Sequence, residues 1–399
     1  FNKTFAFQWQ RKEDNIPVLV WQEFIASMLS IPMAHQMATN YMILDGTPRK
    51  QMIKVMRPYQ VYAASSIIDK VRQHDFDIND QEIGYIWHAT GSGKTISSFK
   101  TAWLASRLPN VDKVIFLVDR VALTNQTVDE YSAYDPEKGE NGNGGVVTDA
   151  ANRWVLSKKI KSKGNGIIVT SIQKMAALVK DKKGINDIAK KNILFIVDEA
   201  HRSTAGDMLQ SIKTTFTRSA WVGYTGTPNF DKAPTTRDIF GNLIHAYTIV
   251  DAIRDGNVLG FKVDFETTLS DEVLKEQYLP AYFKARYPKY SEKQIQDRIE
   301  NLQPEDMDDM IEPSVYDNNQ KHVELVVKDV LDNWDKRSRN SEYNALFTTH
   351  VGGNKASTPM AMMFYREFKK QNKLRKKPLK IGITFSQDNS NSDNQLENN

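Results

Sequence analysis

Five short apolar runs between residues 83 and 224 limit the folds open to this chain. Each has the length of a β-strand, and together they are Ile83–Trp87, Lys113–Val118, Gly166–Val169, Asn192–Val197 and Ala220–Tyr224. The runs are apolar almost throughout and do not alternate with polar residues, which is typical of strands buried on both faces of a parallel sheet. Helical or polar stretches separate them, so the sequence predicts an α/β fold with a parallel sheet flanked by helices.

Composition narrows the class of protein further. The 399 residues include no cysteine, which excludes a disulfide framework, a thiolate metal site and a cysteine nucleophile. No stretch of about 18 consecutive apolar residues occurs, so we expect no membrane span. The formal net charge of +4 is too small to indicate nucleic acid by itself. We expect a cytoplasmic protein. Its partners cannot be read from composition and are inferred from the motifs below.

The first motif, Ala89–Thr95, stands between the run Ile83–Trp87 and a predicted helix. Its glycines let backbone N–H groups turn toward phosphate oxygens, and the helix start adds the positive end of its dipole. Lys94 would neutralise the β and γ phosphates of ATP, and the Thr95 hydroxyl would bind Mg²⁺. The plainer alternative is a glycine-rich turn with a surface lysine. The motif thus predicts an ATP site made by Thr90, Gly91, Ser92, Gly93, Lys94 and Thr95.

Two adjacent carboxylates, Asp198 and Glu199, end another apolar run. A Mg²⁺ ion held by Thr95 and Asp198 would stabilise the first carboxylate. Glu199 would then act as general base toward the attacking water, which makes Lys94, Asp198 and Glu199 the predicted catalytic residues. The alternative is a helix start that favours acidic side chains. His201 follows, but the seven histidines lack metal-ligand spacing, so we expect a hydrogen-bonding role for it.

The third motif, Thr225-Gly226-Thr227, follows the run Ala220–Tyr224. Its two hydroxyls can bridge neighbouring polar groups such as His201, and the plainer alternative is an ordinary turn before Pro228. In this order and spacing, the three motifs resemble superfamily 2 helicases and translocases. The resemblance implies a RecA-like fold of the P-loop NTPase type. It also implies that His201, Thr225 and Thr227 couple hydrolysis to movement.

Further residues take their expected roles from the same resemblance. Gln60, which lies 34 residues before Lys94, looks like the glutamine that reads adenine in that family. Arg120, Thr170 and Lys174 stand where the family contacts the nucleic-acid backbone. For Arg120 the alternative is an ion pair with a neighbouring carboxylate. Backbone contacts of this kind hold register on the nucleic acid and carry no sequence specificity.

A narrower resemblance comes from the motifs together with the residues around them. Trp87–Thr95, Phe116–Arg120, Thr170–Lys174 and Asp198–Ser203 look like the restriction (motor) subunit of type I restriction-modification enzymes. Asp251–Phe261 is similar to that family's link into a second motor lobe. The resemblance implies a bacterial or archaeal enzyme that uses ATP to pump double-stranded DNA before a separate nuclease domain cuts it. Its implied partners are the methylase (M) and specificity (S) subunits.

The resemblance also implies a domain organisation. We expect a connector from a missing N-terminal nuclease domain at 1–45, a RecA-like ATPase lobe at 46–262, a partial RecA-like second lobe with a helical insertion at 263–385, and a disordered tail at 386–399. Within the second lobe we expect strands at Tyr343–Thr348 and Leu379–Phe385 and a helix at Met360–Tyr365. No Gln-x-x-Gly-Arg-like motif follows Phe261. Because an arginine finger contributes about 10³–10⁵ in turnover, we expect Mg-ATP binding with weak hydrolysis.

Two rival functions stay open at this point. A stand-alone helicase on RNA or single-stranded DNA would use the same motifs. An ATP-gated scaffold that never hydrolyses the nucleotide would need no general base, so Glu199 argues against it. The basic stretch Arg366–Lys380 is either a DNA contact or a solvated helix face.

Overall fold

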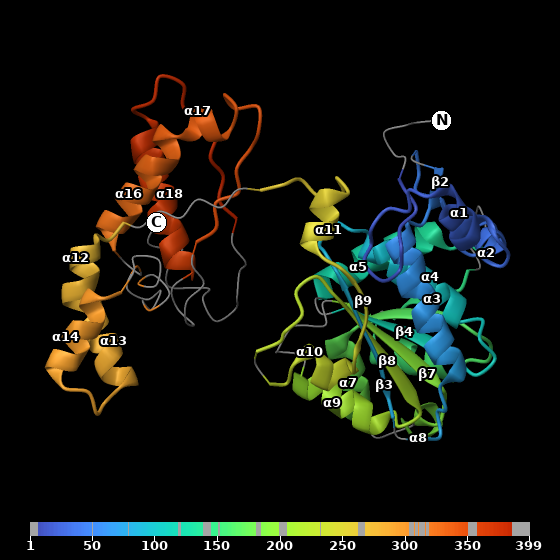
Figure 1. Cartoon of the computed structure of the whole chain (residues 1–399). Helices are drawn as coiled ribbons and strands as arrows, with labels where there is room; N and C mark the ends of the chain where they lie inside the picture. The colour runs from blue at the N-terminus through green and yellow to red at the C-terminus, as the bar shows by residue number, and fades with distance from the viewer. Residues whose placement is uncertain are drawn as a thin grey trace. The chain divides into compact units, whose positions relative to one another are not determined.

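The computed structural model describes residues 7–384, except 50, 79, 119–120, 139–144, 151, 181–184, 199–205, 232, 262–267, 303–306, 308–309, 311–315, 317–318 and 350–356. The chain forms two compact units, Phe1–Phe261 and Lys262–Asn399 (Figure 1). In the described part of the chain, no helix is both long enough and apolar enough to cross a membrane.

The described part of the first unit is built on a seven-stranded sheet in which all neighbouring strands are parallel. The strand order is β5-β6-β4-β7-β8-β3-β9. The strands are β3 (Glu82–His88), β4 (Lys113–Val118), β5 (Val147–Asp149), β6 (Ile167–Ser171), β7 (Ile193–Asp198), β8 (Ser219–Thr225) and β9 (Leu243–Tyr247). The five predicted runs are confirmed as β3, β4, β6, β7 and β8, and with them the α/β class. The two strands that the sequence did not predict, β5 and β9, lie at the edges of the sheet.

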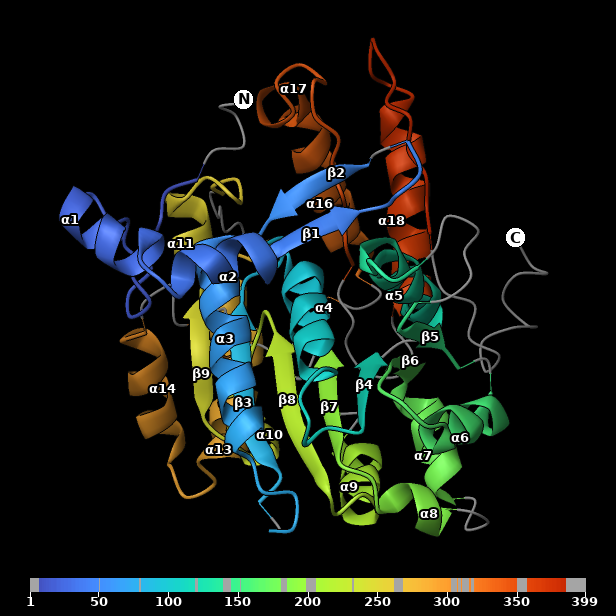
Figure 2. The same ribbon diagram turned by 90° about the vertical axis from the view of Figure 1, so that its right-hand side faces the viewer.

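Helices cover both faces of this sheet. On one face lie α3 (Pro58–Gln73), α4 (Lys94–Ala105) and α5 (Val121–Tyr134), of which α3 and α4 stand in front of the strands in Figure 2. On the other face lie α6 (Arg153–Lys161), α7 (Ile172–Lys180), α8 (Ile185–Ala189), α9 (Gly206–Thr215) and α10 (Thr236–Phe240). In β4, Phe116 packs into the first core and Ile115 and Leu117 into the second. Since successive side chains of a strand point to opposite faces, a strand covered on both sides is apolar throughout.

Residues 7–45 belong to the first unit and pack beside α3 and α4. They form α1 (Trp21–Phe24), the π-helix η2 (Ile25–Leu29), α2 (Met33–Thr39) and β1 (Met42–Asp45), which pairs with β2 (Met52–Val55). Trp9, Met37 and Tyr41 are buried in the core that α3 and α4 share. Near the end of the unit, α11 (Ile249–Arg254) follows β9.

The second unit is helical in its described residues. Its helices are α12 (Asp271–Val273), the π-helix η4 (Leu274–Tyr278), α13 (Leu279–Arg286), α14 (Glu292–Glu300), α16 (Gln320–Asp332), α17 (Trp334–Arg337) and α18 (Ser357–Asn372). The expected helix at Met360–Tyr365 is confirmed within α18. The two strands expected at Tyr343–Thr348 and Leu379–Phe385 are wrong, because residues 343–349 and 378–384 adopt neither helix nor strand. A strand needs a hydrogen-bonded partner strand, and none pairs with these residues in the described part of the chain. The Leu346 side chain is also 90% exposed, so this segment is not covered by a core. The expected tail at 386–399 lies outside the described residues.

Candidate nucleotide site

The phosphate loop, Asp198 and Thr225 meet at one edge of the sheet. β7, β8 and β3 are parallel neighbours, so their carboxyl ends lie side by side. The loop Ala89–Gly93 follows β3, Asp198 ends β7 and Thr225 ends β8. In the sheet register, Thr225 pairs with Trp87 and Asp198 pairs with Tyr224. Ligands of open α/β sheets bind outside the carboxyl ends of the strands, which is where these groups converge.

The phosphate loop depends on two glycines for its backbone conformation. Gly91 has φ +83 and Gly93 has φ +80, a region that favours glycine. Gly93 is the N-cap of α4, so Lys94 and Thr95 stand in the first turn of that helix. The first N–H groups of a helix lack intrahelical acceptors, and they are suited to bind phosphate oxygens. The loop therefore fits the triphosphate that the sequence predicts.

Tyr59 and Gln60, at the start of α3, form hydrogen bonds to the backbone of the phosphate loop. The Tyr59 hydroxyl donates to the Ser92 carbonyl at 2.7 Å. The Gln60 Nε2 amide donates to the Ser92 carbonyl at 3.0 Å and to the Gly93 carbonyl at 3.3 Å, while its Oε1 accepts from the Arg57 N–H at 2.9 Å. Both ends of the Gln60 amide are thus engaged. The contact of Gln60 with adenine stays a prediction, and its contact with the phosphate loop is direct.

The Thr225-Gly226-Thr227 turn lies against the phosphate loop. A Cβ at Gly226 would lie 3.1 Å from Thr90 Oγ1 and 3.3 Å from Lys94 Nζ. Lys94 Nζ itself donates to the His88 carbonyl at 3.4 Å. Thr225 is buried and its Oγ1 accepts from the Thr227 N–H at 3.1 Å, while Thr227 is exposed. The lysine and the turn are therefore close enough for a change at one to move the other.

Thr95 and Asp198 offer the oxygen ligands that Mg²⁺ prefers. Both side chains are half-buried at the carboxyl edge of the sheet. Among the described residues, no three histidine or carboxylate side chains form a cluster that could hold a metal ion. Magnesium needs no such cluster, because it keeps several waters and binds through one or two protein oxygens together with substrate phosphates. Glu199, His201 and Arg120 lie outside the described residues.

The two described candidates for contact with the DNA backbone differ in exposure. Thr170 on β6 is fully buried, so its hydroxyl is not on the surface and the expected contact does not fit this side chain. Residues in the middle of a sheet covered on both faces point into a core, which a motif match alone does not reveal. Lys174 on α7 is nearer to solvent, and its Nζ donates to the Ala150 carbonyl at 3.0 Å.

A buried hydroxyl network behind α4 was not indicated by any motif. The Tyr131 hydroxyl of α5 donates to Ser98 Oγ at 2.8 Å, and Ser98 Oγ donates to the Thr95 carbonyl at 3.2 Å. The Tyr224 and Thr101 hydroxyls lie 2.9 Å apart. Burial raises the pKa of Tyr224 to about 12 and also raises that of Tyr131, so both phenols keep their protons. The network ties the helix that carries Lys94 and Thr95 to α5 and β8.

Two histidines form a second buried contact beneath the loop. His88 Nε2 and His245 Nδ1 lie 3.1 Å apart and connect β3 to β9. Burial lowers the pKa of both imidazoles, to about 4 for His245, so both are neutral near pH 7. Tyr59 packs edge-on against His88 at 5.3 Å and stacks on Tyr247 at 3.6 Å between ring centroids. The phosphate loop is thus supported by an aromatic cluster.

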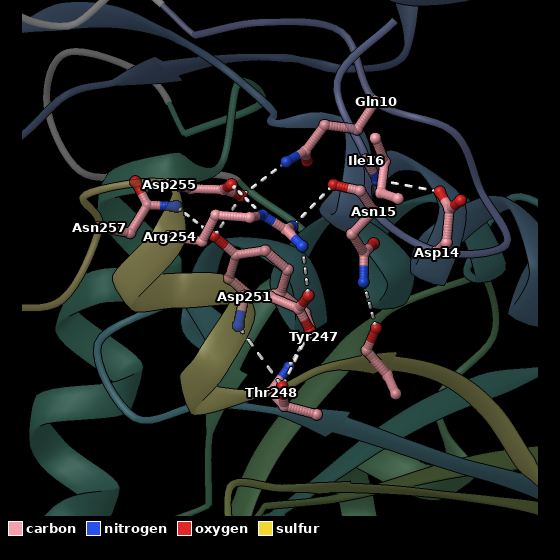
Figure 3. A network of polar contacts seen from close by, with 11 residues as sticks. Gln10, Asp14, Asn15, Ile16, Tyr247, Thr248, Asp251, Arg254, Asp255 and Asn257 are labelled. Atoms are coloured by element: carbon pink, nitrogen blue, oxygen red, sulfur yellow. Dashed lines mark hydrogen bonds and ion pairs between the residues drawn. The ribbon is translucent and has the colours of Figure 1, made fainter.

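A cavity of about 290 Å³ opens beside Tyr59. Its lining includes Phe7, Gln10, Arg57, Tyr59, Asp255 and Asn257. Figure 3 shows the polar network at its rim, in which Asp255 Oδ2 accepts from Gln10 Nε2 at 2.6 Å and from the Tyr247 hydroxyl at 2.9 Å. Arg254 donates to the Asn15 carbonyl at 2.8 Å in the same network. The N-terminal segment and α11 therefore close one side of the cavity.

A family model described as SWI2/SNF2 ATPase matches residues 59–296. This match spans more than half of the chain and includes the phosphate loop, Asp198 and the threonine turn. The chain therefore belongs to the SWI2/SNF2 ATPase family.

Curated relatives narrow the class to type I restriction enzymes. The chain is 34% identical over 390 residues to the type I restriction enzyme SauCOLORF180P endonuclease subunit of Staphylococcus aureus strain COL, covering 96% of this chain and 37% of that protein. It is 34% identical over 393 residues to the SsaAORF53P endonuclease subunit of Staphylococcus saprophyticus, with the same coverage. The UvsW helicase of bacteriophage T4 aligns with a TM-score of 0.36 and 16% identity, over 53% of this chain and 65% of that chain. The chain spans about 37% of the length of these two relatives, and the resemblance to the restriction (R) subunits of type I enzymes is confirmed.

Proposed function

We propose that this chain is the ATP-driven DNA motor of a type I restriction endonuclease (R) subunit. The observation that carries the proposal is the meeting of the phosphate loop, Asp198 and Thr225 at the carboxyl ends of β7, β8 and β3. From the similarity to type I endonuclease subunits, we infer that the substrate is double-stranded DNA and that the partners are M and S subunits. Hydrolysis would drive translocation of the DNA before its cleavage.

The residues divide the work in the following way. The backbone N–H groups of Thr90–Thr95 and the Lys94 ammonium bind and orient the phosphates. Thr95 and Asp198 would hold a Mg²⁺ ion, which would supply positive charge beside the phosphate oxygens. Glu199 accepts the proton of the attacking water. The adenine would enter the cavity that Arg57 and Tyr59 line. Gln60 connects Arg57 to the phosphate loop through its hydrogen bonds to the Arg57 N–H and the Ser92 carbonyl.

The Thr225-Gly226-Thr227 turn would couple ATP hydrolysis to movement along DNA. Because Gly226 lies against Thr90 and Lys94, loss of the γ phosphate would change the contacts of the turn. Thr225 and Thr227 would carry that change toward His201, as the family implies. Replacing both threonines by alanine should uncouple hydrolysis from movement and leave ATP binding intact.

The test measures ATP binding and turnover by the chain, alone and with M and S subunits, in the presence of duplex DNA, single-stranded DNA or RNA. Lys94→Ala is the control for the nucleotide site. We expect the chain alone to bind Mg-ATP and hydrolyse it weakly, and duplex DNA to stimulate turnover only when the partner subunits are present.

Each other outcome points to a different function. Stimulation by RNA or single strands without partners would indicate a stand-alone helicase. ATP binding without turnover under any condition would indicate an ATP-gated scaffold. Strong stimulation of the isolated chain by duplex DNA would contradict the expected weak hydrolysis.

A further inference from the structure

One face of α6 presents a stripe of large exposed side chains. Trp154, Lys158 and Lys161 stand at positions i, i+4 and i+7 and therefore share one side of the helix. The opposite side is anchored, because Leu156 and Ile160 are fully buried in the core beneath the sheet. Lys163 continues the stripe into the loop that follows. We refer to these four exposed residues, Trp154, Lys158, Lys161 and Lys163, as the α6 stripe.

Within residues 153–163 all charged side chains are positive. Residues 153–163 include one arginine and four lysines and no carboxylate. Lys159 is turned inward, where its Nζ donates to the Asp149 carbonyl. Lys161 lies 3.9 Å from Asp187, with side chains 43% and 77% exposed, and such a surface pair contributes little. The stripe therefore presents net positive charge to solvent.

Trp154 is the informative member of the stripe. Its side chain is 67% exposed, and the Arg153 guanidinium lies 5.6 Å from its ring centroid. An exposed aromatic ring among cations suits a polyanion that also offers apolar surface, which duplex DNA does through its sugars and base edges. An anionic membrane surface is the other polyanion of this kind. It is disfavoured because a membrane-bound helix inserts an apolar face, and the apolar face of α6 is already in the core.

The stripe starts at the edge of the sheet where the nucleotide site lies. α6 begins just after β5 ends at Asp149, and the Lys174 ammonium donates to the Ala150 carbonyl close to that start. Figure 2 shows α6 beside α7 at the same end of the sheet as β5 and β6. The segment that leads into α6 is thus in contact with Lys174, one of the residues expected to contact DNA.

We propose that the α6 stripe binds the backbone of duplex DNA, with the lysines on phosphates and Trp154 on the sugar or base edges. The proposal rests on the motor function proposed above and adds a contact outside its motifs. From Trp154 to Lys161 the helix rises about 10 Å at 1.5 Å per residue. A duplex carries one charge per about 1.7 Å of its axis, so more than one phosphate lies within that span.

Salt dependence of duplex binding separates the two parts of the stripe. The affinity of the chain for a short labelled duplex is measured by fluorescence anisotropy at several salt concentrations. Replacing Lys158, Lys161 and Lys163 together by glutamine should reduce the slope of log affinity against log salt by about 0.9 for each phosphate contact removed. Replacing the exposed Lys321, Lys328 and Lys336 of the second unit by glutamine changes the net charge equally and should leave the slope unchanged.

The aromatic contact has a different signature. Trp154→Ala should weaken binding roughly five-fold through loss of apolar contact, with the slope unchanged because no charge is removed. Trp154→Phe should restore most of the affinity. Since all the substituted side chains are exposed, the melting temperature of each variant should match that of the wild-type chain.

The outcomes separate this inference from the proposed function. An unchanged slope and affinity in both stripe variants, with wild-type binding of duplex, would overturn the stripe and leave the motor intact. Binding to phosphatidylserine vesicles in place of duplex would also overturn the stripe. Stripe-dependent duplex binding by a chain that fails to bind ATP would support the stripe and contradict the motor.

Discussion

Replacing Gly93 by alanine should damage the phosphate loop more than the same change at Gly91. Both glycines have nearly the same positive φ, +80 and +83, so alanine pays a similar backbone cost of about 1–2 kcal/mol at either position. What differs is the space around the new methyl group. At Gly91 the nearest atom is Val258 Cγ2 at 3.7 Å, an ordinary contact. At Gly93 it is Gln60 Nε2 at 2.7 Å, which must move.

The additional cost at Gly93 follows from what holds the Gln60 amide. Moving Nε2 gives up its hydrogen bonds to the Ser92 and Gly93 carbonyls. Each such bond contributes about 1 kcal/mol. Gly93→Ala should therefore lower the free energy of unfolding by about 3–4 kcal/mol, and Gly91→Ala by about 1–2 kcal/mol.

Urea unfolding followed by tryptophan fluorescence measures this difference. All tryptophans except Trp334 lie in the first unit, so the signal reports the part of the chain that carries the loop. A double-mutant cycle isolates the clash. In a Gln60→Ala background, Gly93→Ala should cost no more than Gly91→Ala, which gives a coupling energy of about 2 kcal/mol between positions 60 and 93. Equal costs for the two glycine variants in the wild-type background would refute the reasoning.

Three other changes test the contacts around the loop. Gly226→Ala should weaken ATP binding, because the new Cβ would crowd Thr90 and Lys94. Gly260→Ala is the control and should leave ATP binding unchanged, because its Cβ would lie 3.8 Å from the nearest atom. Isothermal titration with ATP measures both affinities. Tyr131→Phe should lower the free energy of unfolding by about 1–2 kcal/mol through loss of the bond to Ser98, and an unchanged urea midpoint would contradict this. His245 has a pKa near 4 when folded and near 6.5 when exposed, so below about pH 6.5 the unfolded state binds the extra proton. His245 should therefore contribute a fall of about 1.4 kcal/mol per pH unit in the free energy of unfolding between those values, and the total fall should be shallower in His245→Phe.

The sequence predicted the centre of the sheet better than its edges. β3, β4, β6, β7 and β8 are covered by helices on both faces, and that burial makes their central residues mainly apolar. The edge strands β5 and β9 lack this pattern, since β5 has three half-buried residues and β9 includes Leu243, which is 43% exposed. Local hydrophobicity detects a strand only where both faces are buried.

In the second unit the sequence predicted two strands that the structure does not contain in its described residues. Tyr343–Thr348 and Leu379–Phe385 have strand-like composition, yet the described residues there find no partner strand. Pairing is a property of two segments, and composition describes only one of them. The helix at Met360–Tyr365 was predictable because its hydrogen bonds are local.

In the candidate site, too, some parts could be predicted from the sequence and others could not. The phosphate loop, Asp198 and the threonine turn were predictable because each motif sits directly after an apolar run. The supports of the loop were not, because they join residues far apart in sequence: the Tyr59 hydroxyl to the Ser92 carbonyl, and His88 to His245. Nothing in the local sequence indicates which side chains will meet across the sheet.

These supports give the nucleotide site a physical connection to the end of the first unit. Tyr59 holds the Ser92 carbonyl and stacks on Tyr247, whose hydroxyl donates to Asp255 just beyond α11. Gln10 donates to the same carboxylate, so the N-terminal segment is tied into the chain of contacts. Packed rings and hydrogen bonds of this kind transmit a displacement when they have two discrete arrangements. We expect a shift of the loop on nucleotide binding to reach Asp255 and Gln10 through these contacts.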